Sequence, residues 1–389
     1  MSDIEDRDGR EVQPPLDWPG APGSARPRVA GAPAWRAGLK QAPESFRVDE
    51  VLGFAPTGAG NHWLMRLEKR DLTTGALVDW IAKVTGTRAR DIGFSGLKDR
   101  NAVTTQWVSV PHESFDPEAF ARACEGEGIG LLALDRHDRK LRRATHRANR
   151  FRLRLHDVEA IGADPSSDLL AYLEPRLAIL AERGMANYFG DQRYGRWFGN
   201  LRGLVEWGEG VRTGRPKRQA RNWLLSTLRS AIFDRVLAER LLAGAIDRVE
   251  PGDLLQLAGS RSRFAAEADE IDALQARLQQ GDVTPTGPLW GEGDSPAGHE
   301  VGAREDRLAD EMLVRFGETL WRRWLADWRV EADRRPLTVR VSDLEVELGE
   351  GEVDLSFSLP PGSYATELVA ELFAVRPSDR GSAGTGLGD

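Results

Sequence analysis

A carboxylate flanked by two cations, Lys98-Asp99-Arg100, follows a stretch that glycine interrupts at Gly93 and Gly96. Glycine lets a loop turn sharply and lets a ligand approach the backbone closely. An ionised carboxylate held in such a loop can act as a nucleophile or as a general base. An ordinary charged turn on the protein surface has the same composition, so the loop alone leaves both interpretations open.

Other kinds of chemistry find little support in the sequence. The Lys98 stretch lacks the Gly-Lys-Ser or Gly-Lys-Thr ending of a P-loop, and Gly58-Ala59-Gly60 lacks the third glycine of a dinucleotide loop. The single cysteine, Cys124, excludes an internal disulfide and a zinc site of several thiolates. No acid cluster is suited to Mg²⁺, and the histidines have no metal-ligand spacing; they are His62, His112, His137, His146, His156 and His299. We therefore expect neither a metal nor a cofactor.

The positive charge is concentrated in two runs, although the formal net charge of the 389 residues is -8. The first run comprises Arg136, Arg139, Lys140, Arg142, Arg143, Arg147, Arg150 and Arg152, with Asp138 as its only acid. The second comprises Arg212, Arg215, Lys217, Arg218 and Arg221. Either run alone is more often just a solvated face, but two such runs in an acidic chain indicate a surface that attracts a polyanion.

The elements that would position Asp99 are strands and one amphipathic helix. Apolar residues alternate over 62–69, which predicts a strand. A helix follows, capped by Thr73 or Thr74 and ended by Gly86, because apolar residues recur at helical spacing between them. The Asp99 loop comes next, and the segment 102–110 is typical of a second strand.

The remaining pattern predicts an α+β domain that is interrupted by a helical one. A short helix at Asp116-Pro117, a strand over 150–156 and a helix over 167–183 precede a mostly helical region with a long segment at 220–242. Strand signals return only near the end, as a hairpin around 346–359. The tail 378–389 is expected to be disordered. No run approaches the roughly 18 apolar residues of a membrane span, and the first 33 residues suggest a flexible extension, not a secretory signal, so a cytoplasmic location is expected.

Five motifs together resemble the TruD family of tRNA pseudouridine synthases and occur in that family's order. The Asp99 loop reads GLKDRNAVTTQW over 96–107, which looks like the family signature. The others are Leu39-Lys40 with Phe46-Arg47-Val48-Asp49-Glu50, then Asn149-Arg150-Phe151, the nine residues NYFGDQRYG at 187–195, and LPPGSYAT at 359–366. The resemblance runs from about Gly38 to about Leu372.

This resemblance implies a mixed-sheet pseudouridine-synthase catalytic domain interrupted by an inserted, mainly helical TRUD domain. The expected parts are a flexible extension over 1–33, a catalytic domain over 34–183 plus 335–389, and the insertion over 184–334. The implied activity isomerises uridine to pseudouridine in tRNA, at position 13 of the D arm, without a cofactor. The implied partner is therefore tRNA.

The family also implies roles for individual residues. Asp99 is the expected catalytic carboxylate, and Lys40 is expected to pair with it, because neighbours of Asp99 in an extended chain point away from it. Phe151 matches the position that packs on the target base, although its strand alternation alone would make it a core residue. Asn149, Phe46, Lys98 and Arg100 complete the expected substrate site. Arg139, Lys140, Arg142, Arg143, Arg147, Arg215, Lys217 and Arg218 are expected to contact the RNA backbone.

Three alternatives remain open from the sequence. Asp99 either attacks the sugar covalently or removes a proton from it. The chain could instead be an RNA-binding protein that keeps the fold without catalysis, against which intact Asp99, Lys40 and Phe151 argue. A metal-dependent nuclease would need a carboxylate cluster that the sequence lacks.

Overall fold

The chain divides into two compact units in a computed structural model that describes residues 17–162, 168–293 and 297–375. One unit contains Arg36–Glu159 and Ser342–Gly362. The other contains residues 17–35, Ala160–Val341 and residues 363–375 within the described ranges. The domain boundaries expected at 183/184 and 334/335 stay a prediction.

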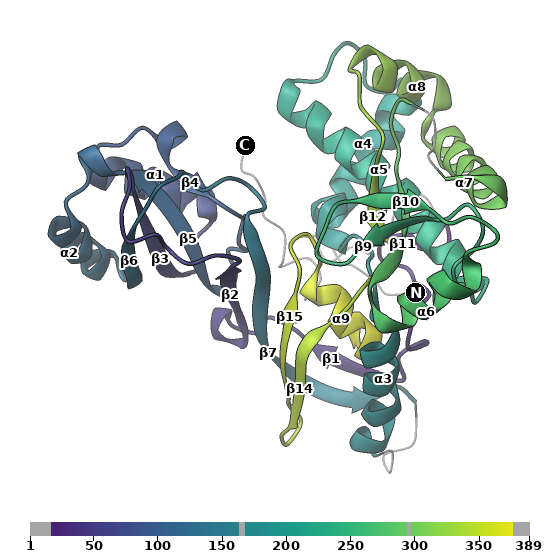
Figure 1. Ribbon diagram of the computed structural model, residues 1–389, viewed down its shortest axis with the longest axis horizontal. Coiled ribbons are helices and arrows are strands. Elements are labelled where there is room, and N and C mark those ends of the chain that lie inside the picture. The colour runs from purple at the N-terminus through teal and green to yellow at the C-terminus, as the bar shows by residue number, and fades with distance from the viewer. Residues whose placement is uncertain (1–16, 163–167, 294–296, 376–389) are drawn as a thin grey trace. The chain divides into compact units, whose positions relative to one another are not determined.

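The unit with Asp99 is built on one mixed sheet in the order β14-β15-β7-β2-β5-β3-β6 (Figure 1). Its strands are β1 (Trp35–Gly38), which adds to β7, then β2 (Phe46–Leu52), β3 (His62–Arg70), β4 (Gly93–Phe94), β5 (Val103–Pro111), β6 (Gly130–His137), β7 (His146–Ala160), β14 (Ser342–Leu348) and β15 (Val353–Leu359). Only β2 and β5 run parallel among the pairs along that order, and β4 adds to β5. The helix between β3 and β4 makes the parallel pair possible, because parallel strands need a crossover.

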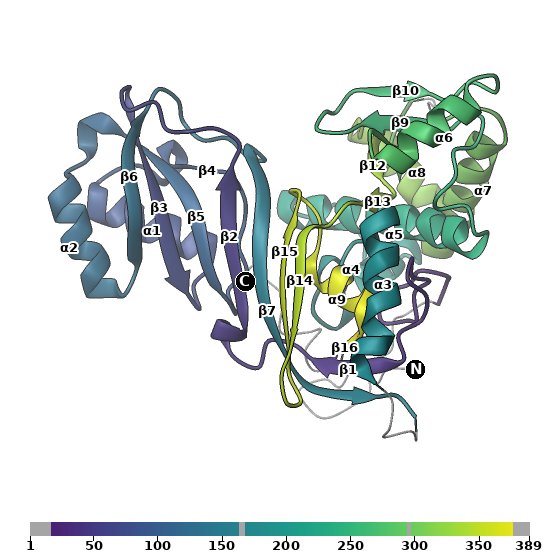
Figure 2. The same cartoon turned by 60° about the horizontal axis from the view of Figure 1, so that its bottom comes forward.

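Two helices pack against this sheet, as Figures 1 and 2 show. Helix α1 (Thr74–Thr85) begins where the Thr73 side chain accepts a hydrogen bond from the Ala76 N–H, and it ends at Gly86 in the left-handed conformation. Helix α2 (Pro117–Glu127) begins in the same way, at Asp116. Both bury their apolar sides in one cluster, which includes Leu77, Ile81 and Phe120. The helices expected at Thr73–Gly86 and at Asp116-Pro117 are confirmed.

The second unit is mainly helical. Its helices are α3 (Leu169–Arg183), α4 (Gly199–Gly208), α5 (Arg218–Leu242), α6 (Ile271–Gln280), α7 (His299–Phe316), α8 (Glu318–Asp327) and α9 (Ala365–Leu372). Helix α5 lies in the core, where Ile232, Phe233 and Leu237 are fully buried among residues that include Trp321. The long helix expected at 220–242 is confirmed.

Strands also occur in this unit, where the sequence predicted none before the end. A sheet of order β10-β9-β11-β12 is formed by β9 (Leu254–Leu257), β10 (Arg263–Ala265), β11 (Val283–Leu289) and β12 (Asp333–Pro336). Short pieces β8 (Met185–Ala186) and β13 (Thr338–Val339) pair with each other, and β16 is Ala374–Val375. The prediction that strands return only near the end is wrong. Pro285, Gly287 and Pro288 hid β11, because proline and glycine disfavour a strand interior.

The expectation of a flexible N-terminal extension is wrong for residues 17–33, whereas residues 1–16 and the tail at 378–389 lie outside the described residues. Trp18 and Ala21 are buried in the helical core. Arg26 is 2% exposed and forms ion pairs with Asp191 at 3.1 Å and Glu367 at 3.3 Å. The extension was read from composition, and composition does not reveal such distant partners.

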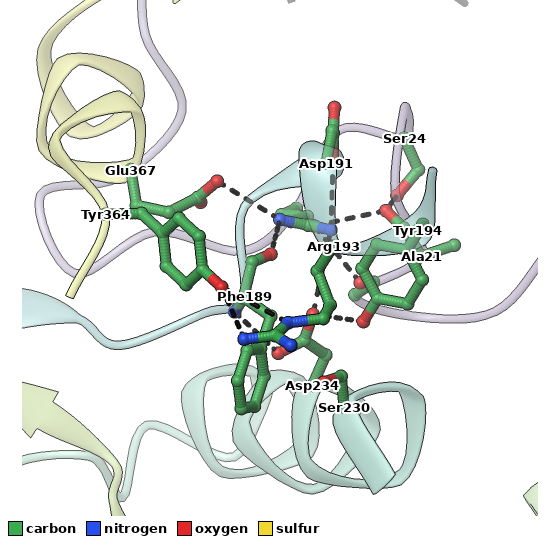
Figure 3. A network of polar contacts seen from close by, with 12 residues as sticks. Ala21, Ser24, Phe189, Asp191, Arg193, Tyr194, Ser230, Asp234, Tyr364 and Glu367 are labelled. Carbon is green, nitrogen blue, oxygen red and sulfur yellow. Dashed lines mark hydrogen bonds and ion pairs between the residues drawn. The ribbon is translucent and has the colours of Figure 1, made fainter. Parts of the chain in front are cut away.

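Arg26 belongs to a buried polar network through its three carboxylate partners. Figure 3 shows those partners, Asp191, Asp234 and Glu367. The Tyr194 hydroxyl donates to Asp234 Oδ2 at 2.6 Å, and Arg26 lies 3.6 Å from the same oxygen. Burial raises the pKa of Asp234 to about 7. Arg193 donates to the Tyr364 hydroxyl at 2.9 Å. Arg193 of the 187–195 motif and Tyr364 of the 359–366 motif therefore meet inside this unit, where the 187–195 motif has a structural role.

Candidate active site

Lys40 and Asp99 form an ion pair, with Lys40 Nζ 2.8 Å from Asp99 Oδ2. The lysine side chain is fully buried and the aspartate side chain is 27% exposed. Lys40 lies between β1 and β2, and Asp99 lies between β4 and β5. The expected pairing of these two residues is confirmed.

Lys40 has an unusual backbone conformation, and contacts of its side chain hold the residue in place. Its φ is 64°, in the left-handed region that non-glycine residues rarely adopt. Its ammonium group lies 3.9 Å from the centre of the Phe46 ring, a distance at which a cation is attracted to the ring face. The ion pair and the aromatic ring together fix the position of the charge beside Asp99.

The backbone of the Asp99 loop rests on a second buried cation, Lys69. Lys69 Nζ donates to the Asp99 carbonyl at 3.2 Å and to the Leu72 carbonyl. Its side chain is almost fully buried, and burial lowers the pKa of Lys69 to about 8. Sequence reasoning missed this residue, although Lys69 continues the buried face of Met65 and Leu67 at period two on β3.

Lys98 points away from Asp99 and pairs with Glu50 of β2. The two side chains are 4% and 0% exposed, and Lys98 Nζ lies 2.9 Å from Glu50 Oε2. The same ammonium group donates to Asn149 Oδ1 at 2.6 Å, while Glu50 Oε1 accepts from the Trp107 N–H at 3.0 Å. The prediction that the neighbours of Asp99 do not pair with it is thus confirmed for Lys98. Arg100 is exposed and pairs with Asp71 at 3.2 Å.

Asn149 connects Lys98 to His146 and Ser95. His146 Nδ1 lies 2.5 Å from Ser95 Oγ, and His146 Nε2 lies 3.3 Å from Asn149 Nδ2. Because the amide nitrogen can only donate, this arrangement requires an unprotonated Nε2 and an Nδ1–H that faces Ser95. Burial lowers the pKa of His146, and Lys98 lowers it further, which favours the same neutral state.

Phe151 belongs to a buried aromatic cluster beside the ion pair. It is 7% exposed, and its ring stacks on Phe357 of β15 with centroids 5.2 Å apart. Phe46 meets it edge-on at 6.3 Å. Phe357 lies directly opposite Phe151 in the register of β15 and β7, a pairing that the sequence pattern of either strand does not reveal. The substrate-packing and core interpretations of Phe151 both remain compatible with this burial.

Four residues of the first basic run, Arg139, Lys140, Arg142 and Arg143, line a hollow of about 970 Å³, which we call the β4 hollow. Its lining residues are Phe54, Ala55, Thr57, residues 92–94, residues 137–143 and Thr145. Arg139, Lys140, Arg142, Arg143 and Arg147 are exposed. Arg215, Lys217 and Arg218 are also exposed but belong to the other unit, where they precede or begin α5.

Neither a metal cluster nor a membrane-spanning helix is found in the described parts of the chain. No three His, Cys, Asp or Glu side chains within residues 17–162, 168–293 and 297–375 lie close enough to hold a metal ion. No helix within those ranges is long and apolar enough to cross a bilayer.

Comparison with known proteins gives consistent matches over most of the chain. The family model of tRNA pseudouridine synthase D (TruD) matches residues 25–202 and 216–372. The tRNA pseudouridine synthase D of Chromohalobacter salexigens is 40% identical over 349 residues, which cover 89% of this chain and 95% of that protein. The one from Pseudomonas syringae pv. syringae is 39% identical over 355 residues, covering 90% and 95%. A solved TruD structure from Methanosarcina mazei has the same fold, with a TM-score of 0.63 and 20% identity over 88% of this chain and 95% of that chain.

Proposed function

The chain belongs to the tRNA pseudouridine synthase D (TruD) family, and on that premise we propose that it isomerises uridine to pseudouridine in tRNA with Asp99 as the reacting carboxylate. The reaction breaks the C1′–N1 bond, turns the uracil and joins C1′ to C5. N1 gains a proton and C5 loses one, so that nothing is oxidised and no atom is lost. The chemistry needs a group that acts on the sugar while the base is detached.

One observation carries the assignment of Asp99. Lys40 holds one carboxylate oxygen, whereas the other oxygen, Oδ1, has no hydrogen-bond or ion-pair partner among the described residues. A partly exposed carboxylate with one anchored oxygen and one available oxygen suits either attack on C1′ or removal of a sugar proton. In both routes Lys40 orients the carboxylate through the anchored oxygen.

The residues around the ion pair have supporting roles in this proposal. Phe151 packs on the target base once the base has left its stack, and Phe46 supports Phe151 and Lys40. Lys98 and Asn149 are too buried to bind the RNA extensively, so we assign them the positioning of the Asp99 loop. Arg100 lies exposed at its end of the loop and contacts the RNA. The phosphate contacts come from Arg139, Lys140, Arg142, Arg143, Arg147, Arg215, Lys217 and Arg218.

We also propose uridine 13 of the D arm as the target and the cytoplasm as the location. The catalytic unit would comprise 34–183 plus 335–389, with 184–334 as the inserted TRUD domain. These finer assignments rest on the family resemblance of the motifs and not on a contact to RNA.

Incubation with unmodified tRNA in the absence of metal tests the proposal. A uridine isomer of unchanged mass is expected at position 13, and its formation should stop in Asp99→Asn. Unchanged RNA would indicate a protein that binds without catalysis, against which the intact ion pair of Lys40 and Asp99 argues. Shortened RNA would indicate a nuclease.

A further inference from the structure

The β4 hollow is not part of the site around Asp99. None of Lys40, Phe46, Asp99 and Phe151 lines it. Its walls come from the loop after β2, from β4, and from the loop that joins β6 to β7. A volume of about 970 Å³ lies at the upper end of the range that small-molecule pockets occupy. Binding of the reacting uridine at Asp99 therefore does not account for the β4 hollow.

The charge around the hollow favours an anion. Arg139, Lys140, Arg142 and Arg143 line it against one acid, Asp138. Asp138 already pairs with Arg139 at 3.2 Å. Neither Arg142 nor Arg143 has a carboxylate within ion-pair distance among the described residues. A protein with a net charge of -8 thus presents unneutralised guanidinium groups at one hollow, which is the pattern expected for phosphate binding.

Two flat rings accompany these charges. The Phe54 ring stacks on His137, with centroids 5.1 Å apart and an angle of 18° between the planes, and Phe54 is 38% exposed. The Phe94 ring lies under the Arg143 guanidinium, 3.9 Å from its centre. A double-stranded RNA backbone would need only the cations. An exposed aromatic face beside phosphate-binding groups is the combination that binds an unstacked nucleotide.

The backbone holds Phe54 in this place. Gly58 N–H donates to the Arg136 carbonyl at 3.1 Å. Gly60 has φ of 122°, and a Cβ atom there would lie 2.4 Å from the His137 carbonyl oxygen. Only glycine allows the loop after β2 to lie so close to the end of β6. The Phe54–His137 stack is therefore built into the fold.

We propose that the β4 hollow binds one unpaired nucleotide of the substrate RNA other than the reacting uridine. Its base stacks on the exposed face of Phe54, and its phosphates meet Arg142 and Arg143. The site depends on the proposed function, since the same RNA must reach Asp99. Phe94 and Asp99 are five residues apart and so at most roughly 18 Å from each other. One RNA strand can occupy both sites at once.

Binding and single-turnover measurements on full-length variants with tRNA test this inference. Phe54→Ala should raise the Kd for tRNA by about 5- to 100-fold, the effect of one lost base stack, and should raise Kd more than it lowers the saturated single-turnover rate. Phe54→Trp should retain the affinity. Leu132→Ala is the matched control, because Leu132 is 50% exposed on β6 and does not line the hollow.

The salt dependence of the Kd for tRNA distinguishes the phosphate contacts of Arg142 from the base stacking of Phe54. Arg142→Ala should reduce the slope of log Kd against log salt concentration by about one, while Phe54→Ala should leave that slope as in the wild type. Arg122→Ala on α2 serves as the charge control. An affinity in Phe54→Ala equal to that of Leu132→Ala would overturn the inference.

Two further experiments identify the ligand of the hollow and show which of the two proposals a negative result rejects. Ultraviolet crosslinking of bound tRNA should join Phe54 or Phe94 to a nucleotide other than the target uridine; crosslinks to the target alone would contradict the inference. Uridine and adenosine monophosphates should compete only weakly with tRNA for the protein. If a mononucleotide instead binds tightly and Phe54→Ala leaves the affinity for tRNA unchanged, the hollow is a site for a free nucleotide. Wild-type protein that isomerises tRNA while these tests fail rejects the hollow only. Wild-type protein without isomerisation rejects the proposed function itself.

Discussion

The ammonium group of Lys40 lies 2.8 Å from one carboxylate oxygen of Asp99, with the lysine side chain wholly buried and the aspartate partly open to solvent. Loss of the carboxylate charge would leave the Lys40 ammonium buried and unpaired, which costs more free energy than leaving the partly exposed Asp99 carboxylate without Lys40. Only the aspartate can meet a substrate. This asymmetry separates the effects of replacing each partner.

Asp99→Asn should abolish turnover and leave tRNA binding nearly intact. The amide oxygen can still accept from Lys40, but it can neither attack C1′ nor take a proton from the sugar. We expect the single-turnover rate to fall by at least about 10³-fold, the scale at which loss of a reacting group acts. Asp79→Asn, an exposed change on α1, is the control. Isomerisation at a normal rate in Asp99→Asn would refute the assignment.

Lys40→Met should lower the saturated rate by about 10²-fold while changing the Kd for tRNA by less than about 3-fold. The charge that orients Asp99 is lost, but the side chain is buried and touches no RNA. Methionine and lysine are both side chains that must adopt the backbone φ of 64° at this position, so the substitution tests the loss of the charge alone. Lys83→Met on α1 is the exposed control. A selective loss of RNA affinity would place Lys40 in binding instead.

The sequence predicted the local elements around Asp99 well because their signals are local. Thr73 and Gly86 mark the ends of α1 as capping residues do, and the alternation at 353–359 matches β15. The pairing of Lys40 with Asp99 was also predicted, from the direction of neighbouring side chains together with the family resemblance. In contrast, β11 was missed because its prolines and glycine disguise a strand that is defined by its partners β9 and β12.

The contacts that the sequence could not predict join residues that are far apart in the chain. Lys98 meets Glu50, and Phe151 meets Phe357, through strand register. Register is set by the packing of the whole sheet, so no single strand pattern contains it. Arg26 likewise has all its carboxylate partners more than 160 residues away, at Asp191, Asp234 and Glu367.

Phe151→Leu distinguishes the substrate-packing role from a purely structural one. Both interpretations predict a loss of stability, since the ring is 7% exposed and stacks on Phe357. Only the substrate-packing role predicts that the saturated rate per folded molecule also falls, by about 10-fold or more. Phe120→Leu, a buried phenylalanine in the α2 cluster, should lose comparable stability at a normal rate. Equal rates in the two variants would make Phe151 a core residue.

Glu50→Gln should destabilise the protein by about 2–4 kcal/mol, because it leaves the Lys98 ammonium buried without a counter-charge. The glutamine keeps an acceptor for the Trp107 N–H. Glu44→Gln breaks an exposed pair with Arg70 and should destabilise the protein much less, because solvent screens that pair. Urea unfolding measures both. The double variant Glu50→Gln with Lys98→Met should recover part of the lost stability. Equal destabilisation by Glu50→Gln and Glu44→Gln would contradict a buried ion pair between Glu50 and Lys98.

His146 should make stability depend on pH on the acid side of neutrality. Burial lowers its pKa in the folded protein, the nearby Lys98 lowers it further, and Glu50 opposes them. The unfolded chain has a histidine pKa of about 6.5 and therefore binds the proton first as pH falls. The neutral His146 thus contributes fully above pH ~6.5, and its contribution declines from about that pH downward through the lower folded pKa.

The geometry gives the same sign as this linkage. A proton on Nε2 would set two donors, His146 and Asn149 Nδ2, against each other, and a flipped amide would then turn its NH₂ group toward Lys98. The unfolding free energy of the wild type minus that of His146→Gln, measured from pH 5 to 8, should rise with pH up to about 6.5, by at most ~1.4 kcal/mol per pH unit. Taking this difference removes the opposite contribution of Asp234, whose raised pKa is common to both proteins. A curve in His146→Gln that still parallels the wild type would show that other groups bind the proton and that the Ser95–His146–Asn149 chain tolerates a charged histidine.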